Sequence, residues 1–209
     1  MKKGIAGLYA ITPDLDDTDD LQRRVAAALR GGTQVLQYRN KSASPRLRLE
    51  QCRLLKAMCA EFGVPLIIND HTALAIEIGT DGLHLGGEDG SISAARADLG
   101  PDRLLGASCY DSLDRAQAAI VAGANHVAFG SFFPSPVKPD AVRPPLELLT
   151  RAKARLDVPV VAIGGITLEN APALITAGAD AVAVISAVFS AQDIEQAASA
   201  FQSLFHTPR

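Results

Sequence analysis

Short apolar runs alternate with longer stretches of helical pattern along the whole chain. Eight runs have the length and composition of buried strands: Gly7–Thr12, Val35–Arg39, Leu66–Asn69, Gly82–Leu85, Leu104–Ser108, His126–Gly130, Val160–Ile163 and Ala181–Ile185. Strands that alternate with helices predict parallel βαβ units with right-handed crossovers. Eight such units without a linker-like segment predict the α/β class and a single (β/α)8 TIM barrel domain over residues 1–209.

A glycine motif supports this repeat. The pattern Gly-[Thr/Ala]-x-x-[Val/Leu] begins at Gly32, Gly79, Gly123 and Gly178, at spacings of 47, 44 and 55 residues. Each copy follows a helical stretch, and glycine ends a helix readily because it adopts the left-handed conformation. Each spacing holds two strand-plus-helix units.

The sequence also predicts where two of the helices begin. Ser44 precedes Pro45, which is typical of an N-cap followed by proline at the first helical position, and this helix can extend to Gly63. Asp17 or Thr18 can cap the first helix.

Composition narrows the class of protein. With 209 residues, 48% of them hydrophobic, the chain can bury a sizeable core. A net charge of −3 and only 5% aromatic residues argue against a nucleic-acid partner. Three cysteines (Cys52, Cys59 and Cys109) without metal-ligand spacing suit a reducing cytosol. No run reaches the ~18 apolar residues of a membrane span, so we expect a soluble, cytoplasmic protein that binds no membrane.

Active sites of such barrels lie at the carboxyl ends of the strands. After the second predicted strand, alternation places Gln37, Arg39 and Lys41 on one face. Arginine grips phosphate through two donors and lysine acts as a point charge, so this segment predicts a phosphate site. Lys138, in a proline-rich loop, is a candidate third cation. Exposed cations on a solvated loop are the alternative interpretation.

Two carboxylates follow neighbouring strands. Asp70 and Asp89 lie just past the third and fourth predicted strands, where they can hold one Mg²⁺ together with substrate phosphate oxygens and water. Two alternatives stay open: an acid/base pair, or a capping role for Asp70 at the following helix.

Two further candidate segments lie at the ends of the last two predicted strands. Gly164 and Gly165 follow the seventh strand, and Ile185 and Ser186 end the eighth. Loops at these positions commonly bind phosphate through backbone N–H groups. A tight turn without a ligand is the alternative.

Other reactive side chains are less informative. His84 and His126 lie within predicted strands and are expected to be packed or hydrogen-bonded rather than catalytic, and Cys109 has no base nearby in the pattern. Three cations, two carboxylates and a separate backbone cradle fit two phosphorylated substrates, one a diphosphate bound through Mg²⁺. The chemistry this predicts is displacement of diphosphate by a monophosphorylated substrate.

Seven motifs follow one another along the chain. They are Leu8-Tyr-Ala-Ile-Thr12, Gln37-Tyr-Arg-Asn-Lys41, Val64-Pro-Leu-Ile-Ile-Asn-Asp70, Asp81-Gly-Leu-His-Leu-Gly86 with Glu88-Asp89, Phe129-Gly-Ser-Phe-Phe-Pro-Ser-Pro-Val-Lys138, Ala162-Ile-Gly-Gly-Ile166 and Ala183-Val-Ile-Ser186. Through these motifs, in this order, the chain resembles the thiamine-phosphate synthase (thiamine-phosphate pyrophosphorylase) family over essentially its whole length.

The resemblance implies a transferase of thiamine biosynthesis that joins hydroxymethylpyrimidine diphosphate to thiazole phosphate, plain or carboxylated, and releases diphosphate. In the family, diphosphate is thought to leave first, so no general base is needed. The expected partners are these small phosphorylated molecules, and a homo-oligomer stays open.

The family's site residues carry over by motif. The residues expected to hold the pyrimidine diphosphate are Gln37, Arg39, Lys41, Asn69, Ser108 and Lys138, with Tyr38 and Asn40 of the same motif as further substrate contacts. Of these, Arg39, Lys41, Ser108 and Lys138 are the expected catalytic residues. Asp70 and Asp89 would bind one Mg²⁺ per subunit. The expected thiazole-phosphate residues are Ser135, Pro136, Val137, Gly165, Ile185 and Ser186.

Some positions depart from the family pattern. The family often has Gln at Gly87, Thr at Ser135 and Val137, and His at Tyr110. A related thiazole tautomerase would need that histidine and lack the full cation and carboxylate set, which counts against it. A non-catalytic barrel that binds thiamine precursors is disfavoured by the intact carboxylates and Lys138. Another phosphosugar enzyme is disfavoured by the lack of a clear acid/base pair.

Overall fold

The computed structural model describes residues 4–87, 89–134 and 143–205. Its eight strands are β1 (Gly7–Ile11), β2 (Val35–Tyr38), β3 (Leu66–Asn69), β4 (Gly82–Leu85), β5 (Leu104–Tyr110), β6 (His126–Phe129), β7 (Val160–Ile163) and β8 (Ala181–Val184). Every strand that the apolar pattern predicts is present, with ends that differ by at most two residues. The four glycine motifs precede β2, β4, β6 and β8, which confirms the repeat.

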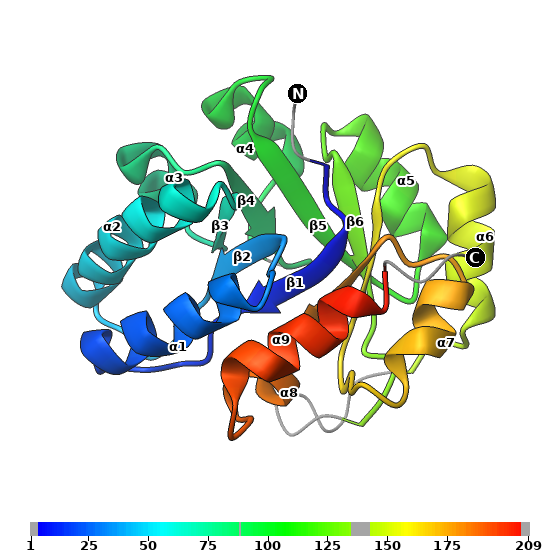
Figure 1. Ribbon diagram of the computed structural model, residues 1–209. Coiled ribbons are helices and arrows are strands. Elements are labelled where there is room, and N and C mark those ends of the chain that lie inside the picture. The colour runs from blue at the N-terminus through cyan, green and yellow to red at the C-terminus, as the bar shows by residue number, and fades with distance from the viewer. Residues whose placement is uncertain (1–3, 88, 135–142, 206–209) are drawn as a thin grey trace.

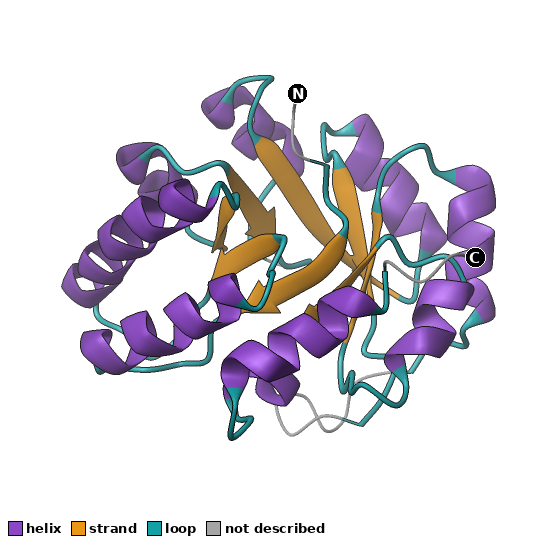
Figure 2. Ribbon diagram, viewed as in Figure 1, coloured by secondary structure: helices purple, strands orange, loops and turns teal. Residues whose placement is uncertain are grey.

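Helices follow the strands around the outside of the barrel (Figures 1 and 2). They are α1 (Thr18–Arg30), α2 (Pro45–Phe62), α3 (Thr72–Ile78), α4 (Ile92–Leu99), α5 (Leu113–Val121), α6 (Glu147–Arg155), α7 (Ala171–Thr176), the short α8 (Ser186–Phe189) and α9 (Ile194–Ser203). Asp17 rather than Thr18 caps α1, by accepting hydrogen bonds from two backbone amides. Ser44 caps α2, which ends at Gly63 in the left-handed conformation with φ 63°.

The strands form one closed parallel barrel in the order β1 to β8, and β1 pairs with β8 to close it. In that closing pair Leu8 lies opposite Val182. Closure in this order confirms the predicted TIM barrel. Because all eight strands run in the same direction, their carboxyl ends meet at one end of the barrel, and the loops that follow them are brought together there.

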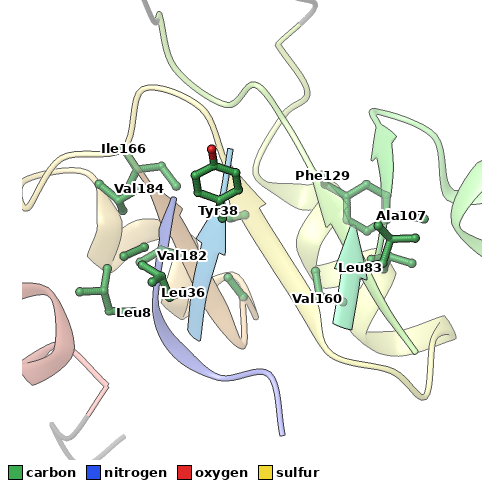
Figure 3. Packing of buried hydrophobic residues seen from close by; sticks show 14 of the residues in the cluster. Leu8, Leu36, Tyr38, Leu83, Ala107, Phe129, Val160, Ile166, Val182 and Val184 are labelled. Atoms are coloured by element: carbon green, nitrogen blue, oxygen red, sulfur yellow. The ribbon is translucent and has the colours of Figure 1, made fainter. Parts of the chain in front are cut away.

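Two apolar layers hold this arrangement. Tyr9, Ile67 and Val161 belong to the cluster inside the barrel. Alternate strand residues face outward and pack against the helices; Leu8 and Val182 are examples, and Figure 3 shows them among their buried neighbours. The same alternation decides which side chains near the strand ends face the barrel axis. No helix in the described part of the chain is long and apolar enough to cross a membrane.

Candidate active site

A cavity of about 920 Å³ opens at the carboxyl ends of the strands. Most of the predicted site residues that the structure describes line it: Gln37, Arg39, Lys41, Asn69, Asp70, Asp89, Ser108, Gly165, Ile185 and Ser186. They come from six different strands or the loops after them, so only barrel closure brings them together. Ser135, Pro136, Val137 and Lys138 lie outside the described residues, and their roles remain predictions.

Tyr38 and Asn40 do not line the cavity, contrary to the sequence-based expectation. The Tyr38 hydroxyl donates to Oε1 of Gln51 on α2 at 2.7 Å, and only 2% of Tyr38 is exposed. The Asn40 amide donates to the Leu15 carbonyl at 2.7 Å. Alternation along β2 and the residues just after it turns Gln37 and Arg39 inward and Tyr38 and Asn40 outward. Tyr38 and Asn40 therefore secure β2 and its loop against α2 and the loop after β1.

The two cationic residues after β2 are held by the loop between β1 and α1. The Arg39 amide donates to Thr12 Oγ1 at 2.9 Å. Arg39 Nη1 donates to both carboxylate oxygens of Asp14, at 3.1 and 3.2 Å, and the Lys41 amide donates to Asp14 Oδ1 at 2.8 Å. Asp14 was not among the predicted site residues, although it lies just beyond the first predicted strand, where site residues of such barrels are expected.

The carboxylates of Asp70 and Asp89 converge above Gly86. Asp70 Oδ1 accepts a hydrogen bond from the Gly86 amide at 3.1 Å, and Asp70 Oδ2 accepts one from the Asn69 side chain. A Cβ built on Gly86 would collide with Asp89 Oδ2 and lie 3.7 Å from Asp70 Oδ1. The absence of a side chain on Gly86 thus lets the Asp89 carboxylate lie against its backbone, on the same side as the Asp70 carboxylate.

Two carboxylates that converge in this way fit Mg²⁺, which favours oxygen ligands. Among the described residues, no group of three or more His, Cys, Asp or Glu side chains could hold a metal. Two carboxylates therefore leave further coordination positions for substrate oxygens and water. The capping alternative for Asp70 is wrong, because His71 is the N-cap residue of α3 and no side chain caps that helix.

Polar side chains also lie in the barrel interior below the cavity. His84 Nε2 lies 3.0 Å from Ser108 Oγ, and the Gln37 amide donates to the Tyr9 hydroxyl at 2.9 Å. Burial lowers the pKa of His84 to about 4, and burial together with the neighbouring His84 lowers the pKa of His126 to about 3. Both imidazoles are therefore neutral at pH 7. His84 is hydrogen-bonded as expected, but it also lines the cavity, which the sequence analysis missed.

The loops after β6, β7 and β8 form the remaining wall. Gly165 has a φ of 63°, and a Cβ there would lie 2.7 Å from the Phe133 carbonyl carbon, so the loop after β6 packs directly on its backbone. The short helix α8 begins at Ser186, directly after β8. A short extra helix at this position is a common part of the phosphate site in TIM barrels.

Cys109 lies on β5 near this site, but its thiol is 1% exposed and burial raises its pKa to about 12. A buried thiol with such a pKa does not act as a nucleophile. Tyr110, Asp111 and Arg115, which the sequence analysis did not select as site residues, also line the cavity.

Comparison with known proteins agrees with this geometry. The family model described as thiamine monophosphate synthase matches residues 8–188. A thiamine-phosphate synthase from Azoarcus sp. (strain BH72) is 57% identical over 205 residues, covering 98% of this chain and 100% of the relative. One from Nitrosomonas eutropha is 54% identical, covering 96% and 95%. The solved structure of thiamine phosphate pyrophosphorylase from Pyrococcus furiosus is 33% identical, with a TM-score of 0.85 and 96% of each chain covered. This chain therefore belongs to the thiamine monophosphate synthase family.

Proposed function

We propose that this chain joins hydroxymethylpyrimidine diphosphate to thiazole phosphate, forming thiamine phosphate and diphosphate, with one Mg²⁺ bound per subunit. The observation that carries this proposal is the presence of two anchored cationic residues and two converging carboxylates at the rim of one 920 Å³ cavity. Diphosphate is a good leaving group only when its charge is neutralised, and these residues provide that neutralisation. Family membership supports the same reaction.

The bond changes need little from the protein beyond binding and charge. The C–O bond between the pyrimidine methylene and the diphosphate breaks, and diphosphate leaves with the electron pair. The thiazole nitrogen supplies its lone pair to the new C–N bond. No proton has to be abstracted, which suits a site where His84 has a pKa of about 4 and is therefore a weak base, and where the buried Cys109 thiol stays protonated.

Each group of residues has a part in this scheme. Arg39 and Lys41 bind the diphosphate and stabilise the charge that develops on it. Asp70 and Asp89 would hold Mg²⁺, which supplies further charge neutralisation when bound. Ser108 and Gln37, each with a hydrogen-bonded partner in the barrel interior, orient the pyrimidine. Lys138 is proposed as a further diphosphate contact.

The thiazole phosphate is assigned to the opposite group of strand ends, after β6 to β8. Gly165, Ile185 and Ser186 line the cavity there, and Ser135, Pro136 and Val137 follow the described part of the β6 loop. Separate sites for the two phosphorylated substrates let both bind at once, so that the thiazole nitrogen is in place when the diphosphate leaves.

The test is formation of thiamine phosphate from the two substrates, with and without Mg²⁺. Plain and carboxylated thiazole phosphate are assayed in parallel, since the second must also lose CO₂. We expect product and diphosphate in equal amounts, only with Mg²⁺. Folded protein that forms neither with any divalent cation would overturn the proposal. We also propose a cytoplasmic location, consistent with three free cysteines, which cell fractionation tests.

A further inference from the structure

The ring of Tyr110 lies on the loop that joins β4 to α4. Its hydroxyl accepts a hydrogen bond from the Gly87 amide at 3.3 Å. Tyr110 ends β5 with a φ of 55°, in the left-handed region that residues other than glycine rarely adopt. Such backbone conformations cluster at active sites and ligand-binding segments. Here the side chain is directed onto the backbone of Gly87.

The contact with Tyr110, and not the backbone conformation of residue 87, is what requires glycine at this position. The φ of Gly87 is not in the left-handed region, so any residue could adopt its conformation. A Cβ at this position would lie 2.6 Å from Tyr110 Cε2 and 3.0 Å from the Tyr110 hydroxyl. The aromatic ring thus occupies the space that a side chain at position 87 would need.

A third residue holds the ring from another direction. The guanidinium carbon of Arg115, in the first turn of α5, lies 5.4 Å from the centre of the Tyr110 ring, which is the geometry of a cation–π contact. The Arg115 amide is itself fixed by a hydrogen bond to the Ser112 hydroxyl at 3.2 Å. A Cβ on Gly87 would also come within 3.2 Å of Arg115 Nη1. Gly87, Tyr110 and Arg115 therefore contact one another at the rim of the cavity, where 36% of Tyr110 is exposed.

The loop on which the ring lies carries Asp89. The Asp89 amide donates to the Gly86 carbonyl at 3.2 Å, which closes a tight turn around Gly87. Asp89 Oδ2 lies directly over Gly86, beside the Asp70 carboxylate. Any displacement of Gly87 moves this turn, and with it the carboxylate. We propose that Tyr110 is a positioning residue that holds the Asp89 carboxylate in its metal-binding place, and that Gly87 and Tyr110 are energetically coupled.

This inference rests on the proposed function, because it takes Asp89 to bind the Mg²⁺ that accompanies diphosphate. Its test is binding of inorganic diphosphate in saturating Mg²⁺ to the full chain, measured by calorimetry, which requires no turnover. Gly87→Ala and Tyr110→Ala should each weaken binding about tenfold. The double variant should bind no more weakly than Tyr110→Ala alone, because the ring is then absent and the exposed Arg115 side chain can move away from the added Cβ. Tyr110→Phe, which keeps the ring, should lose only about threefold.

Two further variants separate positioning from general damage. In an Asp89→Asn background, Tyr110→Ala should have no additional effect on binding, because the carboxylate it positions is already gone. Gly4→Ala, whose Cβ would meet nothing within 4 Å, should bind as the unmodified chain does. Thermal unfolding of each variant confirms that it is folded.

Two results would overturn the inference. One is that the fold-losses in diphosphate binding caused by Gly87→Ala and Tyr110→Ala multiply in the double variant. The other is that Tyr110→Ala weakens binding as much in the Asp89→Asn background as it does in the unmodified chain. If the unmodified chain binds no diphosphate with Mg²⁺, both the inference and the metal assignment fail. If it binds diphosphate with the expected coupling but forms no thiamine phosphate, the proposed function fails and the inference stands.

Discussion

Asp14 binds Arg39 through both of its carboxylate oxygens, which accept from the same guanidinium nitrogen at 3.1 and 3.2 Å. One of these oxygens also accepts from the Lys41 amide. A single residue in the loop after β1 thereby fixes both cationic residues after β2. Among the described residues, Arg39 makes no other side-chain hydrogen bond, so its Nε and Nη2 donors remain for a diphosphate.

Asp14→Ala should raise the KM for the pyrimidine diphosphate about tenfold, because the arginine and the lysine backbone lose their fixed position. The pair is partly exposed, with 16% of the Arg39 and 39% of the Asp14 side chain accessible, so a larger effect is not expected. The KM for the thiazole phosphate should not change. Steady-state kinetics with each substrate varied in turn measures the two values.

Asp14→Asn keeps an oxygen that can accept from the Lys41 amide, so its KM should lie between those of the unmodified chain and the alanine variant. Asp16→Ala removes an exposed carboxylate from the same loop and should leave both KM values unchanged. Equal effects of Asp14→Ala and Asp16→Ala would show that only overall charge matters, and that Asp14 positions nothing.

Asp89→Asn should reduce turnover about a hundredfold or more, because one of two carboxylates that converge above Gly86 no longer carries charge. Asparagine is nearly isosteric with aspartate, so the fold should persist and circular dichroism should not change. The Mg²⁺ concentration for half-maximal rate should rise as well. Activity within a few-fold of the unmodified chain would remove Asp89 from the metal site.

The barrel could be predicted because its signals are local. Buried parallel strands require continuous apolar runs, and helix ends favour glycine, so the residues of each βα unit indicate its structure without reference to the others. The inward positions of Gln37 and Arg39 followed from strand alternation in the same way. Tyr38 and Asn40 were misplaced because the motif was carried over as a block of consecutive residues, although β2 alternates between the two faces.

The parts that could not be predicted depend on contacts between loops. Asp14 reaches Arg39 across 25 positions in the sequence, and Tyr110 reaches Gly87 across 23. In the sequence alone, Gly87 and Tyr110 are two separate departures from the family pattern. Only the folded chain shows that the ring at one position fills the space at the other.

The buried histidines make the stability of the fold sensitive to acid. Burial lowers the folded-state pKa of His84 to about 4 and of His126 to about 3, whereas both return to about 6.5 when the chain unfolds. Between pH 6.5 and 4 the unfolded chain therefore binds protons that the folded chain does not. The free energy of unfolding should fall as pH decreases through this range, by up to about 1.4 kcal/mol per pH unit for each histidine.

Urea denaturation at several pH values tests this with His126→Gln. Loss of packing shifts the free energy of unfolding at every pH, whereas loss of a titrating group changes its slope against pH. Between pH 6.5 and 4.5, we expect the slope of the free energy of unfolding against pH to be smaller in the variant. The difference should be about the contribution of one bound proton. An unchanged slope would mean that His126 takes up its proton equally in both states.

The three cysteines should report on opening of the space between barrel and helices. Cys52, Cys59 and Cys109 are at most 1% exposed, and burial raises the pKa of each thiol to about 12. A thiol reagent at pH 8 should therefore react with the folded chain only through unfolding, and at a rate proportional to the unfolded population.

Leu55→Ala, at a fully buried position between the first two cysteines, should lower the free energy of unfolding by about 2–5 kcal/mol. It should raise the labelling rate of all three thiols by at least about thirtyfold. Val121→Ala, at a position that is 80% exposed, should leave the rate unchanged. Rapid labelling of all three thiols in the unmodified chain would show that the reagent reaches them without unfolding. An increase confined to Cys52 and Cys59 would show that α2 opens separately from the barrel.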